Sequence, residues 1–178
     1  MLLQLTTPPA AEPVTLDQAK AWLRVESGND EDALIAALIP AARARAETHT
    51  GRALMTQGWT LWLDGCGHAI ELPLPPLQSV QAVTLYAPDG TATLLEAGAY
   101  AVAGQRLVFA APPTNLRAAN GIQVAFTAGH GDAADVPAPI AAAILQIVSA
   151  LYDHRGSDVA PTPDAALALL APYRILKL

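Results

Sequence analysis

The stretch "ETHTGRALMTQGWTLWLDG", residues 47–65, changes its periodicity part-way and so divides the chain. Residues 47–50 close a helical pattern, and Gly51 stands where a left-handed helix cap is expected, because glycine adopts a positive φ without steric cost. From Trp59 onward apolar and polar residues alternate, which is the two-residue period of a strand. The stretch therefore predicts a helix that ends near Gly51 and a strand that follows it.

Upstream of this boundary the sequence predicts an extended arm and two helices. Residues 1–14 are rich in threonine, proline and alanine and are expected to form the arm. Thr15 is placed to cap the first helix, because its hydroxyl can accept a hydrogen bond from a free N–H of the first turn. One face of this helix is apolar and is expected to pack in the core: Leu16, Ala19, Trp22 and Leu23.

The second helix is longer and runs to about Thr50. Asn29 or Asp30 is expected to cap it, and the acidic residues that follow suit the positive end of the helix. Pro40 lies inside the pattern and predicts a kink or a break, because proline removes a backbone donor.

Residues 54–128 are predicted to form an antiparallel β module. Turn signals such as "APDG" separate short alternating segments, as in hairpins. "LPLPPLQSV", residues 72–80, is too rich in proline for a central strand and predicts an edge or a crossover. The expected strands are near 56–63, 69–72, 79–86, 91–95, 99–103, 106–110 and 121–128.

Two further helices and a short tail follow the β module. Pro137 and Pro139 suit the first turn of the third helix. Thr162 is expected to cap the fourth, with Pro163 at its first helical position, and Pro172 ends it. The predicted fold class is α+β: a small bundle of about four helices, residues 15–53 and 129–172, with the β module inserted between the second and third helices.

Composition excludes several classes of protein. The 178 residues carry 10 Lys and Arg against 16 Asp and Glu, a net charge of −6, whereas a duplex-binding protein presents a basic face. Cys66 is the single cysteine, so no intrachain disulfide and no thiolate metal cage can form. The longest apolar stretch, from Ile140, is shorter than the roughly 20 residues that span a bilayer. With no secretory signal at the start, we expect a soluble protein made in the cytoplasm, without membrane contact.

The sequence predicts no catalytic, metal or cofactor site. His130 in "AGHGD", with Asp132 nearby, could be catalytic, but histidine beside glycine is more often a turn residue. Cys66 and His68 in "DGCGH" could form a reactive pair, yet a hairpin turn explains both glycines. The remaining candidate is a group of carboxylates at a helix start, where the helix dipole already favours them: Glu26, Asp30, Glu31 and Asp32.

Two features point instead to binding surfaces. Trp59 and Trp62 point to opposite faces of one predicted strand, so at least one of them could lie at an interface. Residues 173–178, "YRILKL", form an apolar tail after a helix-ending proline. Such a tail either packs on its own domain or inserts into a neighbouring subunit or another protein.

In order and spacing, these segments resemble the head–tail connector family, the adaptor or head-completion proteins of long-tailed phages, prophages and gene transfer agents. Gly51, Arg52 and Leu54 match the helix exit of the family, Pro137 and Pro139 the start of its third helix, and residues 172–174 its tail. The resemblance covers nearly the whole chain and rests on five segments: "VTLDQAKAWLRV", "DEDALIAALIPAARARAETHTGRALMTQGWTL", "LPLPPLQSVQAVTLY", "FTAGHGDAADVPAPIAAAILQIVSALYDHRG" and "LLAPYRI".

The resemblance implies a structural virion protein rather than an enzyme, with no cofactor. Family members form a ring of about twelve subunits beneath the portal protein, at the head–tail interface of the virion. The ring extends the DNA channel, through which DNA passes without specific binding, and gives a platform for a stopper or tail-terminator protein. The longer members carry a β module after the second helix.

The resemblance also implies where partners bind. The tail is expected to reach the portal through Tyr173, Arg174, Ile175, Leu176 and Leu178. Ring contacts are expected from the helices and the first strand of the β module: Arg43, Arg52, Trp62, Ile140, Ile144, Tyr152 and Arg155. Two alternatives stay open: a β module that binds a small molecule or carbohydrate on Trp59 or Trp62, and a hydrolase built around His130 and Asp132.

Overall fold

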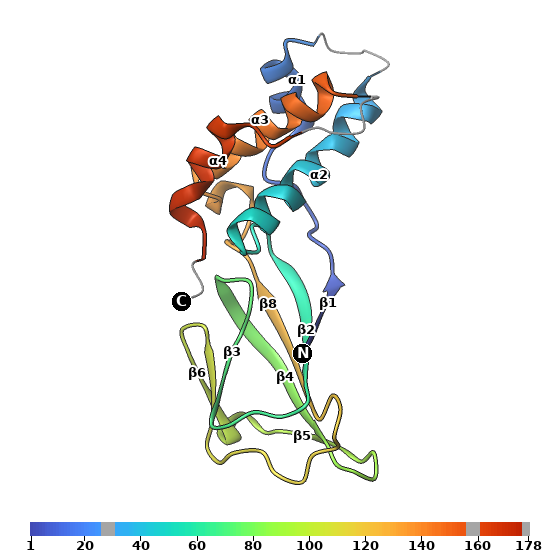
Figure 1. The fold of residues 1–178 in the computed structure, drawn as a ribbon, viewed down its shortest axis with the longest axis vertical. Helices are drawn as coiled ribbons and strands as arrows, with labels where there is room; N and C mark the ends of the chain where they lie inside the picture. Colours follow the sequence, from blue (N-terminus) through green and yellow to red (C-terminus); the bar gives the residue numbers. More distant parts are fainter. Residues whose placement is uncertain (26–30, 156–160, 176–178) are drawn as a thin grey trace. The chain divides into compact units, whose positions relative to one another are not determined.

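The computed structural model describes residues 1–25, 31–155 and 161–175, and its elements confirm the predicted α+β class. The chain divides into two compact units, seen in Figure 1. The helical unit comprises residues 10–55 and 131–178, and the β unit comprises residues 1–9 and 56–130.

Four helices make up the described part of the helical unit: α1 Leu16–Leu23, α2 Asp32–Thr50, α3 Ala138–Asp153 and α4 Asp164–Leu170. Thr15 caps α1 as predicted, in a reciprocal capping box with Gln18. Gly51 caps α2 at φ 73°, and its N–H donates to the Glu47 carbonyl at 2.8 Å, which confirms the predicted helix exit. The predicted caps of α2, Asn29 and Asp30, lie outside the described residues.

The boundaries of the last two helices follow their prolines closely. Pro137 is the N-cap of α3, and Pro139 lies in its first turn, where a missing N–H costs little. Pro163 is the N-cap of α4 rather than its first helical residue. A short 3-10 turn, Ala171–Tyr173, follows α4 and contains Pro172.

Pro40 does not break α2. The helix runs from Asp32 to Thr50 with the proline inside it, so of the predicted kink or break the break is wrong. The lost hydrogen bond would have gone to the carbonyl of Ala36, which is exposed, so water can take the place of the missing donor.

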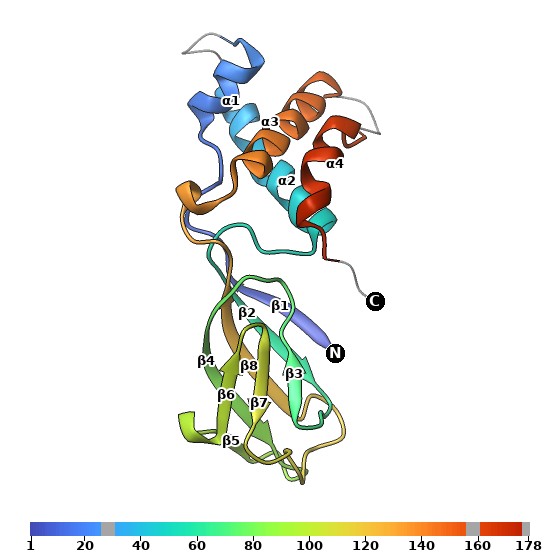
Figure 2. The ribbon, with the colours of Figure 1, turned by 90° about the vertical axis from the view of Figure 1, so that its left-hand side faces the viewer.

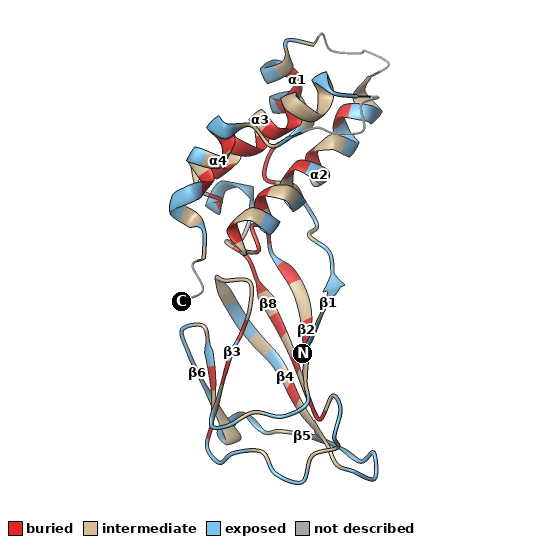
Figure 3. Ribbon diagram, in the orientation of Figure 1, coloured by how far each residue is buried: buried red, intermediate tan, exposed pale blue. Residues whose placement is uncertain are grey.

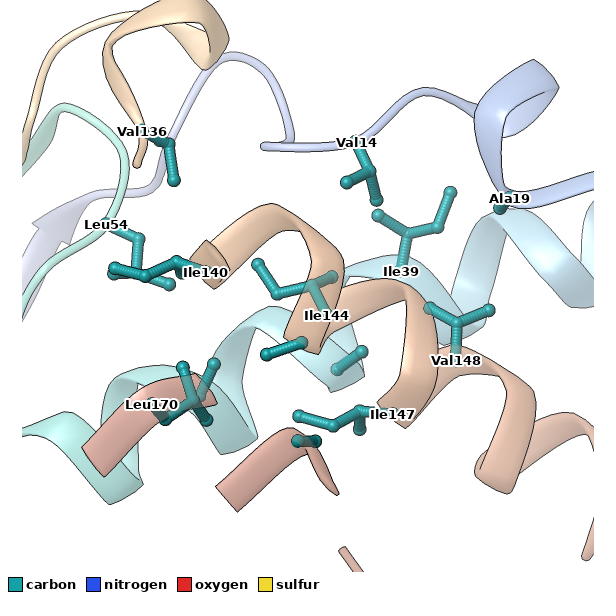
Figure 4. Close-up of a cluster of buried hydrophobic side chains, with 14 of the residues drawn as sticks. Val14, Ala19, Ile39, Leu54, Val136, Ile140, Ile144, Ile147, Val148 and Leu170 are labelled. Atoms are coloured by element: carbon teal, nitrogen blue, oxygen red, sulfur yellow. The ribbon is translucent and has the colours of Figure 1, made fainter. Parts of the chain in front are cut away.

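The core of the helical unit centres on α3 (Figure 4). Ile140, Ile144 and Ile147 are fully buried, and Figure 3 shows the buried stripe along α3. Val14 joins this core from the segment before α1. The remaining core residues come from α1, α2, α4, other positions of α3 and the segments beside the helices: Ala19, Ile35, Ile39, Ala42, Ala46, Leu54, Met55, Val136, Ala143, Val148, Ala166 and Leu170.

The β unit holds two antiparallel sheets (Figure 2). The larger has the strand order β1-β2-β8-β4-β5, and the smaller has the order β3-β7-β6. Seven strands of the β unit lie close to the predicted ranges: β2 Gln57–Leu63, β3 Ala69–Glu71, β4 Leu77–Tyr86, β5 Ala92–Leu94, β6 Tyr100–Ala103, β7 Arg106–Phe109 and β8 Ile122–Ala128.

Residues 1–14 are not a free arm. Leu2–Thr7 form β1, which pairs antiparallel with β2 from Leu2↔Trp62 to Thr7↔Gly58. The pairing partner lies more than fifty residues along the chain, and "LLQLTT" lacks a regular alternation, so local periodicity could not reveal the strand.

Central position in the sheet explains the burial of β8. Its residues alternate between buried and half-buried, with Ile122, Val124, Phe126 and Ala128 on the buried face. β4 pairs with β8 along its length but meets β5 only from Thr84 to Tyr86. The first part of β4 is therefore an edge, in agreement with the prolines that precede it.

Candidate interaction surfaces

Among the candidate catalytic residues, Asp132 and Cys66 have local surroundings that the structure describes, whereas Glu26 and Asp30 lie outside the described residues. The described residues contain no group of three or more histidine, cysteine or acidic side chains that could hold a metal ion. Asp132 forms a capping box with Asp135 at the 3-10 turn Ala133–Asp135. Burial raises the pKa of the Cys66 thiol, which favours the protonated form over the nucleophilic thiolate.

Trp59 and Trp62 do not share a platform. They are three residues apart on β2, which places them on opposite faces of the sheet. Trp62 packs on Tyr86 at 5.7 Å between ring centroids and 36° between planes, and the Arg117 guanidinium lies 4.3 Å from the Tyr86 ring centre. Trp62, predicted at a ring contact, is thus half-buried within an intrachain aromatic cluster.

Arg43 is engaged by two carboxylates of its own chain. Its Nε donates to Glu12 at 2.7 Å and its Nη1 to Glu47 at 2.7 Å, and only 12 % of the side chain is exposed. Burial lowers the pKa of Arg43, but the two carboxylates outweigh it and hold the pKa above its usual value. Glu47 also accepts the Leu54 N–H at 2.9 Å, so this group ties α2 to its exit and to the segment before α1.

The beginning of the tail lies against the α2 exit. Arg52 Nε donates to the Tyr173 carbonyl at 2.5 Å, and the Ile175 N–H donates to the Thr50 carbonyl at 2.9 Å. Tyr173 packs against the helical core. Of the predicted tail, Tyr173 and Ile175 therefore contact their own unit, Arg174 is exposed, and Leu176 and Leu178 lie outside the described residues.

Ile140 and Ile144 are unavailable for ring contacts. Both are 0 % exposed inside the core of their own chain, so their prediction as interface residues is wrong. Helix α3 is apolar on most of its surface, with alanines beside the isoleucines, and such a pattern does not distinguish a core face from an interface.

Tyr152 and Arg155 form a group with Glu31 where α3 ends and α2 begins. The Tyr152 hydroxyl donates to Glu31, and Arg155 lies 3.5 Å from the same carboxylate. The Arg155 guanidinium also stacks over the Tyr152 ring at 4.2 Å. The hydrogen bond to Glu31 raises the pKa of Tyr152 above its usual value.

This raised pKa gives a pH-dependent prediction. In the unfolded chain Tyr152 loses its proton at about pH 10, whereas in the folded protein it does so at a higher pH. The hydrogen bond of Tyr152 to Glu31 therefore stabilises the fold below about pH 10, and this stabilisation is lost as the pH rises through the folded pKa. Tyr152→Phe should therefore lose less stability than the wild type between pH 9 and pH 11. Urea unfolding of the variant and the wild type, followed by helical circular dichroism at each pH, checks this; equal losses of stability in the two proteins would contradict it.

Trp22 lies at a surface groove, not in the core. It is 48 % exposed, although the helical pattern placed it on the core face beside Ala19, which is fully buried. The groove has a volume of about 560 Å³ and is lined, without a charged residue, by Pro13, Val14, Gln18, Ala21, Trp22, Ala133, Val136, Ala138, Ala141 and Leu145.

Residues 13–88 match the family of phage gp6-like head–tail connector proteins. The resemblance to head–tail connectors is confirmed. The matched range begins at the groove-lining Pro13, includes α1, α2 and the Gly51 exit, and ends just after β4. Among curated proteins, no relative matches the chain.

The fold of the whole chain is similar to that of proteins from gene transfer agent (GTA) particles. A chain from the neck of an empty GTA particle, computed with C6 symmetry, superposes with a TM-score of 0.83 at 24% identity, and a chain from a neck computed with C12 symmetry with 0.78 at 24% identity. A chain from the virion of a native gene transfer agent particle gives 0.80 at 25% identity. Each comparison covers 100% of this chain and 97% of the other.

No helix among the described residues is both long and apolar enough to cross a membrane.

Proposed function

We propose that this chain is a structural head–tail connector of the virion neck, without enzymatic activity. The observation that carries the proposal is the similarity of the full chain, at 100% coverage, to chains of GTA necks. The family match to head–tail connectors, made independently over residues 13–88, supports the same role. The strands between α2 and α3 then correspond to the β module of the longer connectors.

The proposed assembly is a ring of about twelve subunits that continues the DNA channel below the portal protein. The neck structures with C6 and C12 symmetry support a cyclic arrangement. The net charge of −6 suits such a channel, because DNA slides past an acidic wall without being held by it. A stopper or tail-terminator protein would bind on the side away from the portal.

The C-terminal tail is the proposed contact to the portal. Its first residues are fixed on the helical unit, since Ile175 bonds to Thr50 and Arg52 holds the Tyr173 carbonyl. Residues 176–178 follow directly from this fixed point and supply two leucines, which suit an apolar anchor.

Ending the chain after Ile175 tests the tail contact without disturbing the contacts of Tyr173 and Ile175. We expect at least about tenfold fewer tailed particles, because loss of interface anchors weakens binding by more than a factor of ten. The count is made by electron microscopy of particles from cells whose own copy of the gene is deleted.

Lys177→Ala is the matched control for this truncation. It removes the charged side chain of residues 176–178 and keeps both leucines, so tailed particles should form at the wild-type level. If the truncated chain also supports normal numbers of tailed particles, the tail is not the portal contact.

A further inference from the structure

A ring of identical subunits requires two different surfaces on each subunit, because every head-to-tail contact joins one face to the other. The helical unit offers a concave candidate in the groove around Trp22, which is apolar and carries no charged lining residue. Trp22 itself is 48 % exposed, which is unusual for so large an apolar side chain and typical of an interface anchor.

The outer face of α2 is the convex candidate. Ile35, Ile39, Ala42 and Ala46 are buried and define the inner face of the helix. At 100° per residue the opposite side is formed by residues 33, 37, 41 and 44, all of them alanine and all exposed. Leu34 flanks them and is 39 % exposed.

The four alanines of the α2 outer face are exposed to solvent in the described part of the chain. A surface helix normally carries charged or polar residues on its solvent side, whereas the exposed positions from 33 to 44 carry none. Small side chains also let a second surface approach the helix backbone closely. A helix that is to fit into a groove needs such a surface.

On this basis we infer that the α2 outer face of one subunit packs into the Trp22 groove of the next subunit in the ring. The inference rests on the proposed function and identifies the two surfaces that build the ring. The groove is lined by α1, the first half of α3 and the segments that precede these two helices, and by no residue of α2, so one subunit presents both surfaces and can be joined on both sides.

Charges at the margins of the two surfaces are complementary. Asp132 and Asp135 flank the groove-lining Ala133, and both are exposed. Arg45 directly follows Ala44 on α2. Opposite charges around an uncharged centre favour one register of docking over others.

A photo-crosslinking benzophenone amino acid in place of Trp22 tests the contact in assembled particles. The full chain is produced in cells whose own copy is deleted, necks are irradiated, and cross-linked peptides are identified by mass spectrometry. We expect dimers and higher oligomers of the chain, with residue 22 joined to a peptide from α2. A chain that is present in necks but whose residue 22 joins β1, the C-terminal tail or the portal would overturn the inference and leave the proposed function intact.

A pair of substitutions gives an independent readout. Ala37→Glu places a charge in the centre of the proposed contact and should lower the amount of chain in necks by about tenfold or more. Ala165→Glu makes the same change at an exposed position of α4 and should have no effect. Equal incorporation of both variants, with unchanged helical circular dichroism, would overturn the inference. Absence of even the wild-type chain from necks would overturn it together with the proposed function.

Discussion

Replacing Ile144 by alanine is expected to lower the free energy of unfolding of the helical unit by about 3 to 4 kcal/mol. Ile144 is 0 % exposed at the centre of the α3 face that packs on the rest of the bundle. The substitution removes buried methyl groups and leaves a cavity that the surrounding helices can fill only in part, so the transfer and cavity losses add.

Urea unfolding followed at the helical circular dichroism signal measures this change, since the helices lie in one unit and the strands in the other. Leu34→Ala serves as control, because it shortens a side chain in the same unit at a position that is 39 % exposed. Leu34→Ala should lower the free energy of unfolding by well under half as much as Ile144→Ala. Similar losses for both variants would show that Ile144 is not a core residue.

Arg43→Met is expected to cost about 2 to 4 kcal/mol of stability in the same unit. Methionine fills much of the same volume but leaves Glu12 and Glu47, with 28 % and 15 % of their side chains exposed, without their cation. Breaking a buried ion pair is expensive because the remaining charges stay desolvated, and partial exposure places this case below the upper end of that range.

The control for Arg43→Met is the same substitution combined with Glu12→Gln and Glu47→Gln. The triple variant removes the two carboxylate charges that face Arg43 in the wild type, and the side-chain amide oxygen introduced by Glu47→Gln can still accept the Leu54 N–H. It should therefore be more stable than Arg43→Met alone. If Arg43→Met unfolds at the same urea concentration as the wild type, the two ion pairs contribute nothing to the stability of the helical unit.

Where local chemistry fixes the structure, the sequence predicts it well. Gly51 is required by a positive φ at the helix end, and Thr15 by a capping box, so both positions follow from nearby residues. The strands of the β module likewise follow from two-residue alternation bounded by turns, and seven of them lie near their predicted ranges.

Local periodicity could not predict the features that depend on residues far apart in the sequence. β1 exists because β2 offers it an edge, and the partners of Arg43 include Glu12, which lies 31 residues away. The sequence also placed Trp22 on a core face and Ile144 at an interface, whereas Trp22 is 48 % exposed and Ile144 is buried. Both lie on apolar helix faces, and only the packing of the other helices decides which face is covered.

We propose that this chain belongs in the ring between portal and tail. The most direct test is cryo-electron microscopy of particles from the source cell, with the neck reconstructed and the identity of the chain checked by mass spectrometry. We expect a ring of this chain beneath the portal, with its C-terminal residues against the portal protein. Tailed particles with a complete neck in which this chain is absent would contradict the proposed function.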